Sequence, residues 1–591
     1  MKINKKISEL RRLMLSEGIS AYLVPMKNNF LDSDLRPNEK RIKFLSNFSG
    51  SAGILFIGIE NNSIFVDGRY TTQAKIEVDE YNIEVNVFNF QSQIDWLKAN
   101  LKDNSIIGFD PKIHSYDEVV KFRNGLKDKK ITLKPLNYNL VDRISKYSPN
   151  QRIFDIVHHK KEYCGIEFKY KLDQIRSKYM KTSDIAIFCQ DKEFISWLLN
   201  LRCYKKKYTP SVPAIAIITH RCCYIYLDKE LTNPKLLDFG ISPIKICDIN
   251  LFGEHLSESM NGVKSILLDK KYISYFYFNK FLELSMQISE LPNLSIHLAK
   301  KNNVEIEGMI KANIQDGSAI CKLLYWIKSN IDNPNIDEVT ITKKSTEVRK
   351  FNNRDYLGPS FPAIVGLNEN SAIIHYSASR KTNKFIHNKG ILLIDSGGQY
   401  KFGTTDITRT IAIGNPSKMM KELYTITLKA HIALANIKFN NNFSGRDLDL
   451  IAREVITKFG YNYNHGTGHG VGSVLSVHEG PQSISPMDNN KYFDEGMVFS
   501  NEPGIYLENK FGIRIENLML LKKEKDMTIE ENLYFEIISF APLDKDLIDK
   551  ELLDATEIEW INQYHVRVRE KIIPQIGGDT VYWINKITSE I

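Results

Sequence analysis

Apolar and polar positions in the first two thirds of the chain follow the same order twice. Residues 6–24 begin with the three-and-four spacing of an amphipathic helix and end in a short strand, and residues 171–189 repeat this outline. A later hairpin that ends at residues 64–67 is matched by one that ends at 225–228. The repeated order predicts two similar domains in tandem.

The pattern changes near residue 300, where a polar stretch precedes a long segment with helical spacing. Residues 305–331 place apolar side chains on one face of an expected amphipathic helix. The chain has 591 residues, more than one hydrophobic core usually organises. We therefore predict three domains, at residues 1–150, 151–302 and 303–591.

The composition is that of a globular protein and argues against a nucleic-acid partner. Hydrophobic residues make up 42% of the chain and charged residues 25%. The 79 basic and 71 acidic residues leave a net charge of +8, spread in short runs such as 205–207. Such runs are typical of solvated surface lysines rather than of a binding patch.

The cysteines and the amino-terminal segment indicate a reduced compartment. The seven cysteines are odd in number and form no C-x-x-C pair, which argues against a disulfide framework. The first twenty residues mix acids and bases where a signal peptide needs an apolar stretch. No apolar run approaches the roughly 18–20 residues of a membrane span. We expect a cytoplasmic protein without a membrane partner.

One predicted hairpin of the last domain presents two aspartates. An apolar strand at 391–394 leads to Asp395 and a Gly-Gly turn, and a second strand is expected to start at Asp406. Strand alternation places Asp406, Thr408 and Thr410 on one face. Thr408 is therefore expected to orient Asp406 from behind.

A second predicted hairpin repeats this design with glutamates. One strand leads to Glu502 and a Pro-Gly turn, and the returning strand is expected to carry Arg514 and Glu516 on one face. Arg514 beside Glu516 could then hold that carboxylate in place.

A glycine-rich segment between the two hairpins carries three histidines, and a fourth precedes both. The segment YNHGTGHGVGSVLSVHEGP contains His465, His469 and His478, and its glycines let the backbone approach a ligand closely. Its glycine spacing does not fit a dinucleotide loop, and the helical H-E-x-x-H zinc motif is absent from the chain. His375 is expected to end a short strand after a Phe-Pro turn, where a structural role is the alternative.

Four carboxylates and one imidazole form the candidate metal centre. Like charges brought together without cations cost several kcal/mol, so a shared site needs metal ions. The alternative is that these acids only cap turns and face solvent. That explanation is adequate for any one of the acids but not for all of them together. The donors suit two divalent cations that hold a water or hydroxide between them. They are Asp395, Asp406, His469, Glu502 and Glu516.

At these residues the sequence resembles the pita-bread metallopeptidases, and within them the three-domain Xaa-Pro aminopeptidases (aminopeptidase P). The resemblance is densest after residue 305, in LIDSGGQY, GTTDITRT, HGTGHGVGS, NEPGIY and FGIRIEN. It continues more weakly in GSAG, VDGRY and WLLNLR of the amino-terminal domains. It implies an α/β (α+β) fold, with two tandem creatinase-like domains followed by a pita-bread catalytic domain.

The resemblance also implies roles for the metal ligands. Asp395 would bind one metal ion, most often manganese, and Asp406 and Glu516 would bridge the pair. His469 and Glu502 would complete the shell of the second ion.

The same resemblance implies substrate contacts and a homodimer. His375 and His478 would contact the substrate around the scissile carbonyl, and His465 would line the proline subsite. Arg69 would reach substrate from the first domain or from a dimer partner, although it could simply cap its hairpin or pair with Asp67. The chain departs from the family pattern at 192–197 and 203–207, which leaves distal substrate contacts open.

These expectations amount to hydrolysis of the bond between an amino-terminal residue and a following proline. A hydroxide bridging the two metal ions would attack the carbonyl, and Glu502 would pass the proton to the proline nitrogen. His478 or His375 would donate to the oxyanion. A prolidase acting on Xaa-Pro dipeptides is the nearest alternative, and a non-catalytic pita-bread binding module is the alternative from another class.

Overall fold

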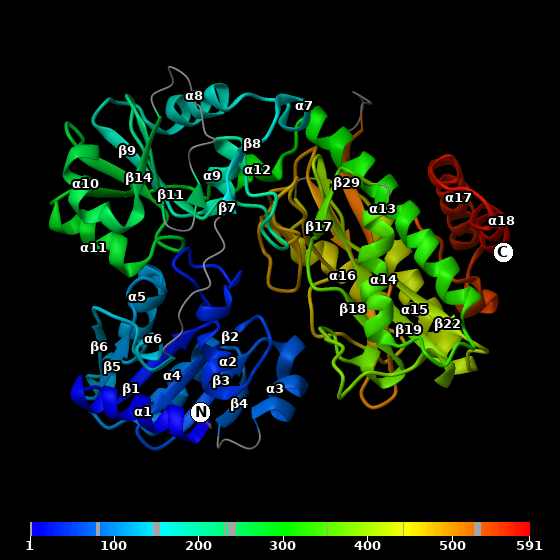
Figure 1. The fold of residues 1–591 in the computed structure, drawn as a ribbon, viewed down its shortest axis with the longest axis horizontal. Helices are drawn as coiled ribbons and strands as arrows, with labels where there is room; N and C mark the ends of the chain where they lie inside the picture. The colour runs from blue at the N-terminus through cyan, green and yellow to red at the C-terminus, as the bar shows by residue number, and fades with distance from the viewer. Residues whose placement is uncertain are drawn as a thin grey trace. The chain divides into compact units, whose positions relative to one another are not determined.

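The computed structural model describes most of the chain and divides it into two compact units. The described ranges are 3–78, 83–145, 154–229, 232–233, 244–351, 353–440, 442–524 and 533–591. The first unit comprises 1–158, 168–203 and 212–293. The second comprises 159–167, 204–211 and 294–591. Each unit is described by itself below, with the element labels of Figure 1.

The first half of the amino-terminal unit is a mixed six-stranded sheet with order β4-β3-β2-β1-β5-β6. β1 pairs antiparallel with β2 and parallel with β5. The strands are β1 (Ala21–Pro25), β2 (Gly53–Gly58), β3 (Asn62–Val66), β4 (Ile83–Val87), β5 (Ile106–Phe109) and β6 (Thr132–Pro135). The helices are α1 (Ile3–Ser16), α2 (Arg41–Ser46), α3 (Thr71–Val78), α4 (Phe90–Asn100), α5 (Tyr116–Gly125) and α6 (Leu140–Ser145).

The second half of this unit repeats the same sheet. Its order is β14-β12-β11-β9-β15-β16, and β9 again pairs antiparallel with one neighbour and parallel with the other. The strands are β9 (Ile185–Cys189), β11 (Ala214–Ile218), β12 (Cys223–Leu227), β14 (Ile244–Asp248), β15 (Ser265–Leu268) and β16 (Gln287–Glu290). The helices are α8 (Phe168–Tyr179), α9 (Lys192–Leu198), α10 (Phe252–Ser259) and α11 (Tyr275–Glu283). The predicted duplication is confirmed by this identical pairing scheme.

The helices and strands that revealed the duplication form where the apolar pattern placed them. Ile7, Leu10 and Met14 of α1 are buried, and Gly18 adopts a φ of +67° directly after the helix. Only glycine adopts that left-handed conformation without strain, which explains why the helix ends there. In the second copy, the predicted strand at 185–189 is β9.

The second unit begins with a long helix that packs on several sheets. The helix α13 (Asn303–Ser329) is capped by the Asn302 side chain, and it contacts α14 (Glu338–Lys350), as Figure 1 shows. A three-stranded sheet has the order β18-β19-β22, and a six-stranded sheet has the order β23-β30-β29-β26-β24-β25.

The sheets and helices of this unit enclose its hydrophobic core. The strands of the two larger sheets are β18 (Ile364–Leu367), β19 (Gly390–Ser396), β22 (Ile407–Ile413), β23 (Lys438–Phe439), β24 (Gly468–Gly470), β25 (Glu479–Ile484), β26 (Val498–Asn501), β29 (Asn517–Lys523) and β30 (Leu533–Ile537). The short strands are β17 (Tyr356–Pro359), β20 (Gly398–Tyr400), β21 (Gly403–Thr404), β27 (Gly504–Leu507) and β28 (Phe511–Arg514). The remaining long helices are α15 (Lys418–Ala435), α16 (Gly445–Thr457), α17 (Ala555–Ile572) and α18 (Asp579–Ile587).

Two short segments from the middle of the chain belong to this unit. The helix α7 (Lys161–Cys164) lies against the start of α13, where the Asn302 side chain donates to the Cys164 carbonyl at 2.9 Å. Tyr163 packs against Phe402, and the backbone carbonyl of Phe402 lies close to Gly308 of α13. Within the described ranges, no helix combines the length and the apolar character needed to cross a bilayer.

Candidate metal centre

The first pair of acids lies where two antiparallel strands of the three-stranded sheet meet. Asp395 is the penultimate residue of β19 and lies opposite Thr408 of β22. Asp406 lies one residue before β22, so the expected start of this strand is displaced by one position. Both aspartates are buried.

The second pair flanks the paired ends of β26 and β29 in the six-stranded sheet, where Asn501 lies opposite Asn517. Glu502 directly follows β26, and its amide donates to the Thr467 carbonyl at 2.8 Å. Glu516 lies between the end of β28 and the start of β29. Our expectation of one continuous strand through Arg514 and Glu516 is wrong, because the β27–β28 hairpin ends at Arg514 and the chain joins the six-stranded sheet only at Asn517.

His469 brings a nitrogen to these carboxylates. Its Nδ1–H donates to the Gly470 carbonyl at 3.0 Å, which leaves the Nε2 lone pair directed elsewhere. Nε2 lies 3.6 Å from Oδ2 of Asp406 and 3.5 Å from Oε1 of Glu502. The imidazole therefore faces the carboxylates as a potential metal ligand.

The donor atoms are close together and incompletely bonded. One ligand atom each of Asp406, His469 and Glu516 lies within 4.8 Å of the other two. Among the described residues, Oδ1 of Asp395, Oδ1 of Asp406 and Oε1 of Glu516 are buried without a hydrogen-bond partner. Buried carboxylate oxygens in that state are costly unless a cation binds them. The donor set therefore fits divalent metal ions.

The pKa values of the carboxyl groups describe the same electrostatic conflict. Burial, and then the charge of Glu516, raises the pKa of Asp406 well above its usual range. Burial, and then the charge of Glu502, does the same to the pKa of Glu516. Burial also raises the pKa of Asp395, although Arg514 opposes this shift. Bound cations would remove the conflict by stabilising the ionised forms.

Thr408 and Arg514 support the centre, but neither hydrogen-bonds the carboxylate that we expected, which was Asp406 for Thr408 and Glu516 for Arg514. Thr408 Oγ1 donates to Oε2 of Glu516 at 2.7 Å, and Arg514 Nη2 donates to Oδ2 of Asp395 at 2.6 Å. Arg514 Nε also lies 3.9 Å from Glu502. The difference follows from the sheet change after Arg514: the Arg514 side chain reaches Asp395 of β19, and Glu516 lies beside β22, where its amide donates to the Thr408 carbonyl at 3.2 Å.

Arg409 supports the centre from the opposite face of β22 and was missed from the sequence. Its Nη1 donates to the Glu516 carbonyl at 2.7 Å, and Nη2 donates to Oδ1 of Asn517 at 2.8 Å. The guanidinium also donates to the carbonyls of Ala541 and Pro542. A charged residue inside an otherwise uncharged strand was the available signal.

His431 of α15 was also missed, and it joins the two glutamate-bearing segments. Its Nδ1–H donates to the Asn501 carbonyl at 3.1 Å, and its Nε2 accepts from Asn517 Nδ2 at 3.0 Å. Asn501 precedes Glu502 and Asn517 follows Glu516. Burial lowers the pKa of His431 to about 3, so the ring stays neutral. A lone histidine in an amphipathic helix gave no sequence signal.

Two of the substrate-contact candidates lie on the same glycine-rich segment as His469. His478 is exposed, and its ring lies edge-on to that of His469 with centroids 4.3 Å apart. His465 Nε2 hydrogen-bonds the hydroxyl of Tyr506 at 2.9 Å, and that hydroxyl accepts from Arg514 at 2.8 Å. Tyr506, which sequence analysis did not single out, therefore links His465 to the arginine that holds Asp395.

The other two candidates lie elsewhere. His375 is half-buried in a turn after the 3-10 helix Asn368–Ala372, so the expectation that it ends a strand is wrong. The preceding strand β18 already ends at Leu367. Arg69 lies in the amino-terminal unit, where its Nε donates to Oδ1 of Asp67 at 2.7 Å. That pairing is the alternative we considered for this arginine.

Models of known protein families match most of the chain. The model of metallopeptidase family M24 matches residues 307–523, and the model of the C-terminal region of peptidase M24 matches 531–591. The creatinase/prolidase N-terminal domain matches twice, at 6–144 and 147–305. The two-copy match agrees with the duplicated sheets.

Three similar proteins match nearly the whole chain, and each is named as an aminopeptidase. The chain is 33% identical to Xaa-Pro aminopeptidase 1 of Dictyostelium discoideum, over 97% of this chain and 94% of that protein. It is 29% identical to aminopeptidase P1 of Arabidopsis thaliana, over 99% of both. A crystal structure of X-prolyl aminopeptidase from Caenorhabditis elegans, described as a cytosolic enzyme with a di-nuclear active site, matches with a TM-score of 0.93 at 28% identity, over 100% of both chains.

Proposed function

Since the chain belongs to the Xaa-Pro aminopeptidases of metallopeptidase family M24, we propose that the carboxylate and histidine centre described above carries its peptidase activity. The enzyme is a metal-dependent hydrolase that cleaves the bond between an amino-terminal residue and a following proline. The observation that carries the assignment of the centre is that Asp395, Asp406 and Glu516 each bury a carboxylate oxygen without a hydrogen-bond partner among the described residues. Ligand atoms of Asp406 and Glu516 also lie within 4.8 Å of a ring nitrogen of His469.

Five side chains would hold a pair of divalent cations, for which we propose manganese. Bound there, the cations would polarise the scissile carbonyl and make a nucleophile available at neutral pH. Asp406 and Glu516 would bridge the pair. Their pKa values are raised well above the usual range, so their ionised forms would gain most from bound cations. Asp395 would bind one ion, and His469 and Glu502 the other.

Glu502 is the carboxylate best suited to move a proton. It is half-buried, whereas Asp406 and Glu516 are buried. Ser500 donates to its Oε1 at 3.4 Å, which is a weaker hold than Thr408 has on Glu516. Glu502 would take the proton of the attacking water and deliver it to the proline nitrogen. A tertiary amide nitrogen leaves poorly unless it is protonated, so this transfer completes the cleavage.

Histidines around the centre would bind the substrate. His478 is exposed beside His469 and would donate to the oxyanion that forms at the carbonyl carbon, with His375 as the second candidate donor. His465 and Tyr506 would form the wall of the proline subsite, since their hydrogen bond fixes both rings. Arg69 would contact substrate from the amino-terminal unit, within one chain or across a homodimer.

We further propose a cytoplasmic homodimer with domains at 1–150, 151–302 and 303–591. The proposed compartment is supported by the similar Caenorhabditis elegans enzyme, which is described as cytosolic. Peptides with proline at the second position would be the substrates.

Replacement of Asp406 by asparagine tests the proposed centre. We expect Asp406→Asn to abolish cleavage of a short Xaa-Pro peptide and to reduce bound manganese, because a bridging ligand loses its charge. The matched variant His478→Ala should reduce turnover and retain both ions, since its role is confined to the substrate. Metal analysis and initial rates on the same preparations measure both effects.

Two results would contradict the assignment. Full activity of Asp406→Asn would remove this aspartate from the centre. Faster hydrolysis of an Xaa-Pro dipeptide than of a longer Xaa-Pro peptide would identify the activity as that of a prolidase.

A further inference from the structure

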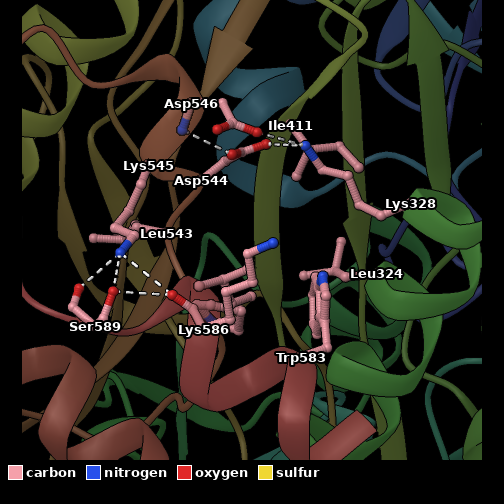
Figure 2. Close-up of a pocket in the computed structure, with 12 residues that line it drawn as sticks. Leu324, Lys328, Ile411, Leu543, Asp544, Lys545, Asp546, Trp583, Lys586 and Ser589 are labelled. Carbon is pink, nitrogen blue, oxygen red and sulfur yellow. Dashed lines mark hydrogen bonds and ion pairs between the residues drawn. The ribbon is translucent and has the colours of Figure 1, made fainter. Parts of the chain in front are cut away.

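A cavity of about 480 Å³ lies in the second unit and contains none of the proposed metal ligands. Its volume falls within the range of small-molecule sites, which is roughly 300–1,000 Å³. Figure 2 shows the side chains around it. The lining residues come from α13, β22, the segment after β30, and the end of the chain: Leu324, Lys328, Ile411, residues 542–546, Trp583, Lys586, Ile587 and Ser589.

One wall of this cavity is apolar. Leu324 and Leu543 are buried, and the Trp583 ring is half-buried beside them. Trp583 and Ile587 are four residues apart on α18 and therefore share a face of that helix. This wall would accept the hydrocarbon or aromatic body of a ligand.

Both acidic side chains of the cavity contact the same lysine. Lys328 Nζ lies 2.8 Å from Oδ2 of Asp544 and 3.4 Å from Oδ2 of Asp546, as Figure 2 shows. Lys545, in contrast, donates to uncharged acceptors, namely the carbonyl and hydroxyl of Ser589 at 2.9 and 2.6 Å. With Lys586, the lining carries three lysines against two aspartates, which leaves one positive charge in excess.

Two donors remain without an acceptor. Within the described part of the chain, neither Lys586 Nζ nor the Trp583 indole N–H has a hydrogen-bond partner, and Figure 2 shows the Lys586 ammonium reaching into the cavity. A lysine in the last turn of a helix is common because it offsets the helix dipole. That explanation does not account for the indole donor or for the adjoining apolar wall.

We propose that this cavity is a second ligand site, for a small organic carboxylate with an apolar or aromatic body. The carboxylate accepts from Lys586 and the Trp583 N–H, and Lys545 of the same lining adds to the positive field. The body of the ligand lies on Trp583, Leu324 and Leu543. A cation of the same shape binds less well, because the lysines of the lining outnumber its aspartates by one.

Binding of 4-fluorophenylacetate to the metal-loaded, full-length enzyme tests this site by fluorine NMR titration. We expect saturable binding of this anion and no comparable binding of 4-fluorophenethylamine, its cationic counterpart. Lys586→Glu should weaken the anion by at least about five-fold, as reversal of a partly exposed charge does. Lys571→Glu makes the same charge change at an exposed position of α17 outside the cavity and should leave the affinity unchanged.

Both variants should hydrolyse an Xaa-Pro peptide at the wild-type rate, which verifies that they are folded. Equal affinity of Lys586→Glu and wild type would overturn the proposal, and so would equal binding of the amine. If the carboxylate bound only at the metal centre, Lys586→Glu and wild type would bind it with equal affinity, because that binding does not depend on Lys586. Crystals soaked with the anion should place it against Trp583, and density confined to the metal centre would contradict the site.

Discussion

Thr408 fixes one oxygen of Glu516 and leaves the other available. Its hydroxyl donates to Glu516 Oε2 at 2.7 Å, while Oε1 is buried without a hydrogen-bond partner among the described residues. Because the hydroxyl also accepts from Arg514 Nε at 3.3 Å, its proton is directed at the carboxylate. A carboxylate oriented in this way presents its second oxygen to a cation without reorganisation.

Thr408→Val should therefore weaken metal binding with little change of shape. We expect a loss of about ten-fold or more in manganese affinity, in line with the removal of other hydrogen bonds behind metal ligands. Thr408→Ser keeps the hydroxyl and is the matched control. Isothermal titration of the metal-free proteins measures the difference, and equal affinities of the valine and wild-type proteins would contradict this role.

His565 is a residue whose charge state links stability to pH. Its Nε2 accepts from the Leu543 amide at 3.2 Å, and burial lowers its pKa to about 3. The folded protein keeps this ring neutral, whereas the unfolded chain protonates it below about pH 6.5. The depressed pKa thus contributes stability above pH 6.5 that is lost as the pH falls toward 3.

Replacing His565 with glutamine should remove this pH-dependent loss. Glutamine can accept from the Leu543 amide but cannot titrate. Between pH 6.5 and 5 we expect the wild type to lose up to about 2 kcal/mol more than His565→Gln, from one proton taken up on unfolding. Calorimetry of the chelator-treated proteins at both values measures it. A parallel decline of the two proteins would show that His565 is already protonated when folded.

At the residue scale, the sequence suggested the candidate ligands and also Thr408 and Arg514 behind them, but not which carboxylate each of these two residues contacts. Asp395 and Glu502 are recognisable because each follows an apolar strand and precedes a glycine-containing turn. The partners of Thr408 and Arg514 depend on the change of sheet between Arg514 and Asn517. Strand alternation says nothing about the direction of a side chain beyond such a change.

At the scale of elements, α15 holds the two glutamate segments in register through His431. The ring contacts the Asn501 carbonyl and the Asn517 side chain, and Asn501 Nδ2 donates back to the His431 carbonyl at 2.9 Å. A helix thereby connects the ends of β26 and β29, immediately beside Glu502 and Glu516. No periodicity of the helix sequence encodes this contact, because it depends on which strand ends the helix crosses.

His431→Phe should loosen both glutamates while filling the same space. The change leaves a buried carbonyl and a buried amide unpaired, at a cost of about 1–3 kcal/mol each. We expect lower manganese affinity and an earlier unfolding transition of the second unit. His431→Gln can still accept from Asn517 and should lie between this variant and wild type. An unchanged manganese affinity of His431→Phe, measured by titration, would mean that the glutamates are positioned without the helix.

The duplicated sheets were the part of the fold that the sequence predicted best. Each copy buries both faces of its central strands, as in β1 and β11, so the apolar pattern of both copies is constrained in the same way. The short pairings of β8 (Val157–His158) with β10 (Leu201–Arg202) depend on residues distant in sequence and gave no local signal.

At the scale of the whole molecule, chain order and compact units do not coincide. Segments 159–167 and 204–211 lie within the middle domain of the sequence yet belong to the second unit. His159 Nδ1 and the Tyr204 hydroxyl, one from each segment, hydrogen-bond at 2.9 Å. A domain boundary predicted from sequence divides the chain at one position, so it could not place segments 159–167 and 204–211 in the second unit.

The packing of α7 predicts which unit a substitution in the middle of the chain will destabilise. Tyr163 is in the sequence of the middle domain but packs with Phe402, Tyr356 and the α13 residue Ala312. Truncation of a partly buried aromatic ring costs about 2–4 kcal/mol. Tyr163→Ala should therefore lower the unfolding temperature of the second unit and leave that of the first unit in place.

Calorimetry can assign the two transitions, because added manganese stabilises only the unit that binds it. Tyr170→Ala is the matched control: Tyr170 is an exposed residue of α8, in the first unit, and its loss should shift neither transition. If Tyr163→Ala instead lowered the unfolding temperature of the transition that manganese does not shift, α7 would stabilise the first unit. The 159–167 segment would then contribute nothing to the stability of the unit that holds the metal centre.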